Sequence, residues 1–144
     1  MKKILVVDDD LNIASALAIR LQAAGYEPLT AISGLTALDL ALHQKPDLII
    51  TDIWMPMGLG LSFAQRLRTL GLGAIPIIFM TASKLRGLRH AAINLGAAGF
   101  FEKPYDPQEV LDAVSQALAA KSAGPSLNAT TVNEELRHEQ NTHH

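Results

Sequence analysis

The chain of 144 residues contains no cysteine, only 5% aromatic residues and no long hydrophobic run. The lack of cysteine excludes disulfides, thiolate nucleophiles and cysteine-ligated metal ions. The longest apolar runs, at 4–7, 48–50 and 74–80, are far shorter than the roughly 18 residues that a membrane-spanning helix requires. We therefore expect a soluble protein without a membrane partner, and the composition is compatible with the cytoplasm.

The chain also has no excess of positive charge. Its 12 Lys and Arg residues and 14 Asp and Glu residues give a formal net charge of −2 at pH 7. Because non-specific binding to nucleic acid depends on basic surfaces, we expect no direct contact of this chain with nucleic acid. We do not expect the start, Met1 to Lys3 followed by 4–7, to be a secretion signal, because Asp8 to Asp10 end the apolar run with three acids.

Strand-like and helix-like segments alternate along most of the chain. Short aliphatic runs predict strands, and segments with apolar residues three or four positions apart predict helices. This alternation predicts an α/β fold, a doubly wound parallel sheet of five strands with five helices. The predicted strands are 4–7, 26–31, 48–51, 75–80 and 99–102, and the predicted helices are 11–24, 34–45, 60–70, 85–95 and 107–121.

The sequence changes character after residue 121. From Ser122 onward it is rich in Ser, Asn, Thr and Glu and has no sustained apolar stripe. We therefore predict one domain over 1–121 and a polar C-terminal tail over 122–144. The composition of the tail favours disorder, with at most a turn or two of helix at 133–138.

Polar residues follow four of the predicted strands at the point where each strand ends. Asp8 and Asp9 follow the first strand, Asp52 the third, Thr81 the fourth and Lys103 the fifth. In a parallel sheet these ends meet at one edge, which is where ligands bind in such folds. The sequence therefore predicts one site built from all five residues.

The three carboxylates of this site need a countercharge. At an effective dielectric constant near 20, two such charges repel by about 4 kcal/mol at a separation of 4 Å. A hard divalent cation with oxygen ligands, Mg²⁺ with Mn²⁺ as a substitute, fits this residue set best, and it suits phosphoryl transfer. Taken singly, each residue has a plainer explanation: Asp8 to Asp10 as a solvated turn with Asp10 capping a helix, and Thr81 as another cap.

Four motifs together resemble the response-regulator receiver family of two-component signalling. They are Leu5-Val6-Val7-Asp8-Asp9-Asp10, Asp52-Ile53-Trp54-Met55-Pro56, Thr81-Ala82-Ser83 and Glu102-Lys103-Pro104. The likeness covers roughly residues 2–120. It implies the flavodoxin-like receiver fold with strand order 2-1-3-4-5, as in single-domain chemotaxis regulators.

The resemblance also implies roles for the residues at the site. Asp52 would be the phosphoacceptor of an aspartyl phosphate. Asp9 and Asp52 would ligate Mg²⁺ directly, Asp8 through a water molecule, and Trp54 through its backbone carbonyl. Lys103 would hold the phosphoryl group.

The remaining implications concern switching. Thr81 would move toward the phosphoryl group, and the ring of Phe100 would turn inward with it. This movement would alter the face formed by 85–95, 99–102 and 107–121, where a downstream protein would bind. The family's peptide bond between Lys103 and Pro104 is typically cis.

The implied partner is a histidine kinase or a histidine phosphotransfer protein. The chain would be a signalling phosphoprotein that catalyses only its own phosphorylation and dephosphorylation, as a monomer or a weak phosphorylation-dependent dimer. One alternative is a receiver cut from a longer regulator with a DNA-binding or enzymatic output domain. A remote one is an aspartyl-phosphate phosphatase, a class that has a second Asp where Trp54 stands here. The bulk of Trp54 either shields the acyl phosphate from water or only packs on its loop.

Overall fold

One parallel sheet of five strands forms the centre of the molecule, in the order β2-β1-β3-β4-β5. The computed structural model describes residues 1–53, 60–82 and 86–122. The predicted fold class and strand order are confirmed. The elements in chain order are β1 (Lys3–Val7), α1 (Leu11–Ala23), β2 (Glu27–Ala31), α2 (Gly34–Gln44), β3 (Leu48–Asp52), α3 (Gly60–Thr69), β4 (Ile77–Thr81), α4 (Arg86–Asn94), β5 (Gly99–Glu102) and α5 (Pro107–Ser122).

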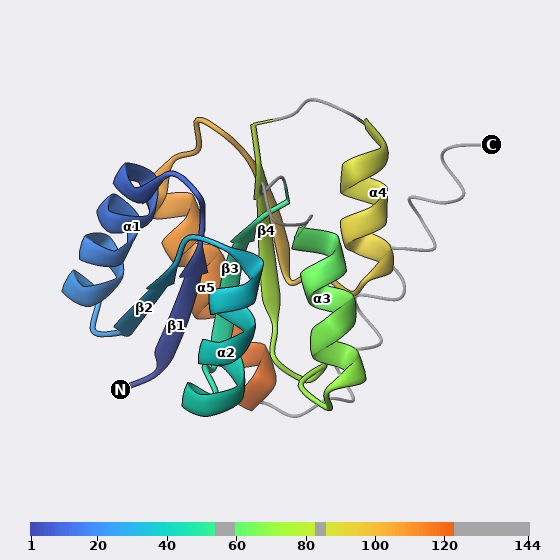
Figure 1. Cartoon of the computed structure of the whole chain (residues 1–144). Helices are drawn as coiled ribbons and strands as arrows, with labels where there is room; N and C mark the ends of the chain where they lie inside the picture. Colours follow the sequence, from blue (N-terminus) through green and yellow to red (C-terminus); the bar gives the residue numbers. More distant parts are fainter. Residues whose placement is uncertain (54–59, 83–85, 123–144) are drawn as a thin grey trace.

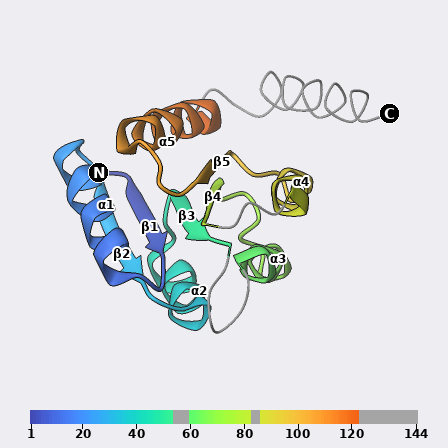
Figure 2. The same cartoon turned by 90° about the horizontal axis from the view of Figure 1, so that it is seen from above.

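Helices cover both faces of this sheet. α1 and α5 lie on one face, and α2, α3 and α4 lie on the other (Figures 1 and 2). Because successive side chains of a strand point to opposite faces, each central strand contributes to both layers of the core. Ile50 of β3 packs toward α1 and α5, whereas its neighbour Ile49 packs toward α2 and α3.

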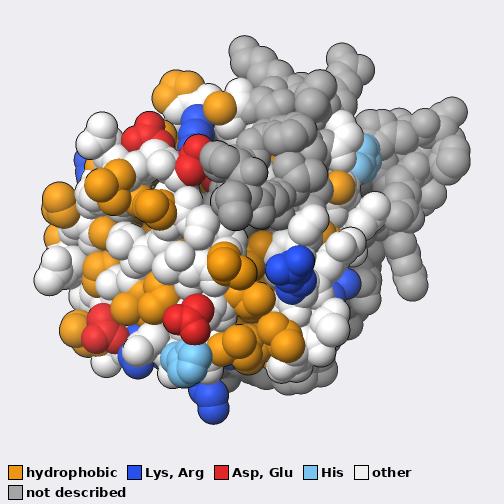
Figure 3. All heavy atoms as spheres, in the orientation of Figure 1, with side chains coloured by type: hydrophobic (Ala, Val, Ile, Leu, Met, Phe, Trp, Pro, Cys, Tyr) orange, Lys and Arg blue, Asp and Glu red, His pale blue; other side chains and the backbone are white. Residues whose placement is uncertain are grey.

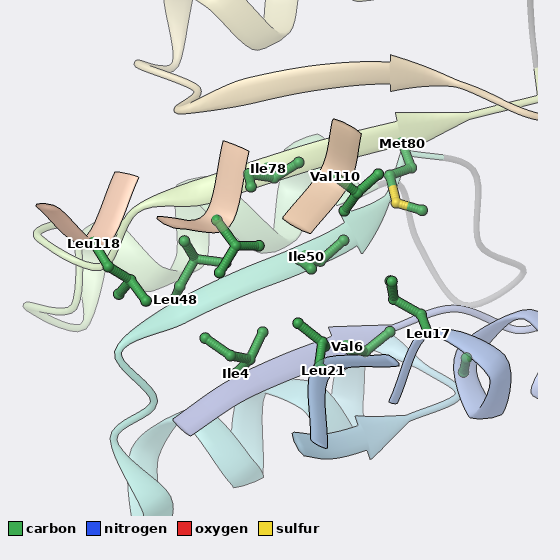
Figure 4. Packing of buried hydrophobic residues seen from close by; sticks show 12 residues of the cluster. Ile4, Val6, Leu17, Leu21, Leu48, Ile50, Ile78, Met80, Val110 and Leu118 are labelled. Carbon is green, nitrogen blue, oxygen red and sulfur yellow. The ribbon is translucent and has the colours of Figure 1, made fainter. Parts of the chain in front are cut away.

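The layer under α1 and α5 shows how the central strands are held in register. Val6 of β1 lies opposite Ile50 of β3, which in turn lies opposite Ile78 of β4. Leu17 and Leu21 of α1 and two valines and a leucine of α5 close over this row (Figure 4). All five residues of β3 are buried, so the strand that ends in Asp52 is the most enclosed part of the sheet.

Asp10 begins α1 as the predicted cap. Its Oδ1 accepts hydrogen bonds from the backbone N–H groups of Asn12, at 3.0 Å, and Ile13, at 3.3 Å. Amide groups in the first turn of a helix have no partner inside the helix, so the carboxylate satisfies two of them. The cap thus fixes the direction in which the chain leaves Asp8 and Asp9.

Replacing this cap should lower the stability of the whole domain. We expect Asp10→Ala to reduce the free energy of unfolding by about 1 kcal/mol, measured by urea denaturation. Asp10→Asn is the matched control, because an amide oxygen also caps helices well. An equal loss in both variants would mean that the negative charge, and not the cap, stabilises this turn.

Most element boundaries lie within a residue or two of the prediction, and the start of β4 and the end of α2 differ for reasons that the structure shows. β4 begins at Ile77 and not at 75, because Pro76 has no N–H to donate, although its carbonyl still accepts from the Ile49 amide at 3.0 Å. α2 ends with Lys45 in the left-handed conformation, φ 47°, which is normally a glycine position. Nothing in the sequence signals a left-handed lysine.

The tail predicted for 122–144 lies outside the described residues except for Ser122, the last residue of α5. In the part of the chain that the structure describes, no helix combines the length and the apolar character needed to cross a bilayer.

Candidate functional site

The predicted residues meet at the edge of the sheet where the strands end. Asp8 follows β1, Asp52 is the last residue of β3 and Thr81 the last of β4. Lys103 follows β5, and its backbone N–H donates to the Thr81 carbonyl at 2.7 Å. Asp8, Asp52 and Thr81 are buried. Acidic and basic side chains gather at this edge, near the top of Figure 3.

Lys103 bridges two of the carboxylates. Its Nζ donates to Asp8 Oδ2 at 2.7 Å and to Asp52 Oδ2 at 2.6 Å. The Lys103 side chain is 14% exposed, and those of Asp8 and Asp52 are 3% and 6% exposed. Bringing such charges out of water is costly unless they are paired, so this ammonium group is the internal countercharge of the site.

The environment shifts the pKa values of the bridged groups. Burial raises the pKa of Asp8, and the lowering effects of Lys103 and of the Asp10 N–H, which donates to Asp8 Oδ1 at 2.9 Å, offset this only in part. Burial by itself lowers the pKa of Lys103, but the hydrogen bonds and charges of Asp52 and Asp8 together outweigh it, so that pKa is raised.

The acidic residues fit a magnesium ion. One carboxylate oxygen from each of Asp8, Asp9 and Asp52 lies within 4.8 Å of the others. The donors are oxygen atoms alone, the type that Mg²⁺ prefers. Asp9 is exposed while the other two are buried, so the group opens to solvent on one side. These three side chains would hold the ion.

The two residues predicted to act as a switch, Thr81 and Phe100, lie on neighbouring strands. Phe100 of β5 lies opposite Phe79 of β4 and packs against a small cluster that includes Ile53 and Ala92. The Phe100 ring is half-buried. The Lys103–Pro104 peptide bond is cis, as predicted from the resemblance. Trp54, with its predicted carbonyl ligand and shielding role, lies outside the described residues.

The sequence argument missed Tyr105 at this edge. Tyr105 packs against the core under α1 and α5. Burial raises the pKa of its hydroxyl, and the charges of Lys103 and Asp8 also act on it. Its position directly after Lys103 and Pro104 is the only signal in the sequence that places it near the site.

Comparison with known proteins agrees with this geometry. Residues 4–115 match the profile of the Response regulator receiver domain. The chain belongs to this family. Receiver domains are signalling domains and not classical enzymes; they partner with histidine kinases and bind Mg²⁺ at an acidic cluster.

Three similar proteins illustrate the range of relatives of this receiver. The probable transcriptional regulator ycf27 of Cyanophora paradoxa is 38% identical over 134 residues, 93% of this chain and 55% of that protein. Sporulation initiation phosphotransferase F of Bacillus subtilis is 35% identical over 121 residues, 84% of this chain and 97% of that protein. Response regulator TrrA of Thermotoga maritima, solved with Mg²⁺ and BeF, is 34% identical with a TM-score of 0.72 and covers 81% of this receiver and 99% of its own chain.

The receiver spans about half the length of the curated transcriptional regulators that it matches, for example 55% of the Bacillus subtilis regulator PhoP. Those relatives contain segments with no counterpart in the sequence given.

Proposed function

We propose that this receiver accepts a phosphoryl group on Asp52, with Mg²⁺, from a histidine kinase or a histidine phosphotransfer protein. One observation carries the proposal. The Asp52 carboxylate ends the most buried strand, lies 2.6 Å from the Lys103 ammonium and shares a compact group with Asp8 and Asp9. The site thus places the proposed nucleophile, the Asp52 carboxylate, beside the Lys103 ammonium group and beside the carboxylates that would hold Mg²⁺. Phosphoryl transfer uses positive charge of both kinds.

The transfer forms one bond and breaks one. An oxygen of the Asp52 carboxylate attacks phosphorus, and the bond from phosphorus to the donor's imidazole nitrogen breaks with its electron pair left on nitrogen. Lys103 moves its hydrogen bonds from carboxylate oxygens to a phosphoryl oxygen. Asp8, Asp9 and Asp52 would hold Mg²⁺, and the ion would supply positive charge to neutralise the phosphoryl oxygens. The backbone carbonyl of Trp54 would complete the protein ligands.

Switching then follows from the new charge on Asp52. Thr81, at the end of the adjacent strand, would turn its hydroxyl toward the phosphoryl group, and Phe100 would move into the space this opens. Together they would bias the face formed by α4, β5 and α5 between two states, and a downstream protein would read that face. The chain would catalyse only its own phosphorylation and dephosphorylation.

Two arrangements of the whole protein remain open to test. Near-complete coverage of sporulation phosphotransferase F, 97%, supports a receiver over 1–121 that acts through protein contacts, followed by a tail over 122–144. The coverage of only 55% of ycf27 supports the alternative of a longer regulator with an output domain. The full gene sequence distinguishes them.

The proposed chemistry predicts a specific mass change. On incubation with acetyl phosphate and Mg²⁺, we expect intact-mass spectrometry with acid quenching to show a single added phosphoryl group. The same incubation with excess EDTA should give none, because the grouped carboxylates then lack the divalent cation. Mn²⁺ should restore the adduct.

A sample with no adduct after rapid quenching at several times would contradict the proposal. So would an adduct that forms equally well in EDTA, because it would place the modification outside the acidic group.

A further inference from the structure

Arg68 joins the far ends of two neighbouring helices. It lies in the last turn of α3, and its Nη2 donates to the backbone carbonyl of Leu95 at 2.7 Å, just after α4 ends. The carbonyl groups at the end of a helix lack partners within the helix and carry partial negative charge. A guanidinium is therefore a suitable partner for this end of α4.

Two glycines border the Arg68 side chain, and Gly73 leaves space for its stem. A Cβ atom at Gly73 would lie 3.1 Å from Arg68 Cγ, closer than side chains normally pack. A Cβ atom at Gly96 would lie 3.5 Å from Arg68 Nη2, and Gly96 has φ +76°, which side-chain-bearing residues rarely adopt. The exposed Arg68 side chain thus runs past Gly73 and reaches the Leu95 carbonyl beside Gly96.

The same end of α4 is also tied to the sheet. Gly96 N–H donates to Ile93 O at 2.9 Å, and Ala97 N–H donates to Ala92 O at 3.1 Å, which closes the helix. Ala98 N–H then donates to Ile77 O, at the start of β4, at 2.7 Å. In contrast, the first residue of α4, Arg86, follows the switch residue Thr81 by only five positions in the sequence. One end of α4 is anchored and the other adjoins the site.

We propose that Arg68 is a positioning residue that makes the C-terminal end of α4 a fixed pivot, so that phosphorylation moves only the end of the helix near Thr81. The proposal rests on the proposed function, because it concerns how the charge on Asp52 reaches the output face. It assigns to α3 a part in switching that the site residues alone do not reveal.

Amide hydrogen exchange measured by NMR on the full chain tests this pivot. In the wild-type protein, acetyl phosphate with Mg²⁺ should change the exchange rates of the His90 and Ala91 amides several-fold. It should leave Gly96 and Ala97 within about twofold. In Arg68→Met, which keeps the stem beside Gly73 but has no donor, Gly96 and Ala97 should exchange about tenfold faster, as expected for one lost charge-assisted hydrogen bond. These two amides should now also respond to phosphorylation.

Controls separate this effect from general destabilisation and from loss of the chemistry. Arg66→Met changes an exposed arginine on the same helix and should behave like wild type. Intact mass should show the Asp52 adduct in all three proteins; its absence from the wild type would count against the proposed function and not against the pivot. The pivot is wrong if Gly96 and Ala97 respond to phosphorylation as strongly as His90 in the wild type. It is also wrong if Arg68→Met leaves their response unchanged.

Discussion

Asp52→Ala is expected to abolish phosphorylation by acetyl phosphate completely. Asp52 ends the central strand opposite Met80 of β4, and it is one of two buried acids that Lys103 contacts, at 2.6 Å. Asp8 contacts the same ammonium at 2.7 Å, but we assign it to the metal. Intact mass after incubation with acetyl phosphate and Mg²⁺ should therefore show only the unmodified variant.

The matched control for this prediction is Asp39→Ala. Asp39 is an exposed aspartate on α2 that pairs with His43 and lies outside the acidic group. It should acquire one phosphoryl group at the wild-type rate. An adduct that persists in Asp52→Ala would assign the acceptor to another residue, and peptide mapping after borohydride reduction would show which one.

Lys103→Met should have the largest effect on stability. The variant keeps a side chain of similar length but leaves two buried carboxylates, Asp8 and Asp52, without their countercharge. Removing one partner of such a buried pair typically costs 3–5 kcal/mol. We expect a loss of about 3 kcal/mol in the free energy of unfolding in metal-free buffer, measured by urea denaturation. Added Mg²⁺ should restore part of this loss in the variant.

The pH dependence supplies a second test of the same variant. Lys103 has a folded-state pKa raised above 10.5, so its stabilising effect is complete below that value and is lost only as the pH rises through the folded pKa. Asp8 has a pKa raised above 3.8, so its contribution is greatest in acid and falls as the pH rises. Without the lysine, which lowers the pKa of Asp8, the Asp8 carboxylate should bind a proton more readily. Lys103→Met should therefore regain stability relative to the wild type as the solution is made more acidic.

Lys121→Met, a change of an exposed lysine at the end of α5, is the control and should unfold like the wild type. The prediction is wrong if Lys103→Met is as stable as the wild type at neutral pH without metal. That result would show that the two carboxylates do not need the ammonium group.

The sheet and the residues that meet at its edge could be predicted from the sequence, because both depend on local patterns. Buried runs such as 48–51 end at polar residues, and parallel strands bring those ends together. The positions of Asp8, Asp52, Thr81 and Lys103 at one edge were therefore predictable. The place of Asp10 directly before a helical stripe is enough to predict that it caps α1.

Contacts between segments that are distant in the sequence were not predictable in the same way. The Arg68–Leu95 hydrogen bond depends on the rotation of two helices and on the space that Gly73 leaves beside the arginine stem. The resemblance predicts that Lys103 contacts a phosphoryl group, and in the structure Lys103 lies between Asp8 and Asp52. The sequence predicts that the carboxylates need a countercharge. That Lys103 supplies it depends on how the strands and loops pack.

The bridge between Lys103 and Asp8 also affects how the site forms during protein synthesis. The two residues are 95 positions apart, and Asp52 lies 51 positions before the lysine. A nascent chain that ends before β5 has all three carboxylates but not the ammonium group between them. The site is therefore completed only after most of the domain has left the ribosome, and an unfinished chain lacks the lysine needed to hold a phosphoryl group.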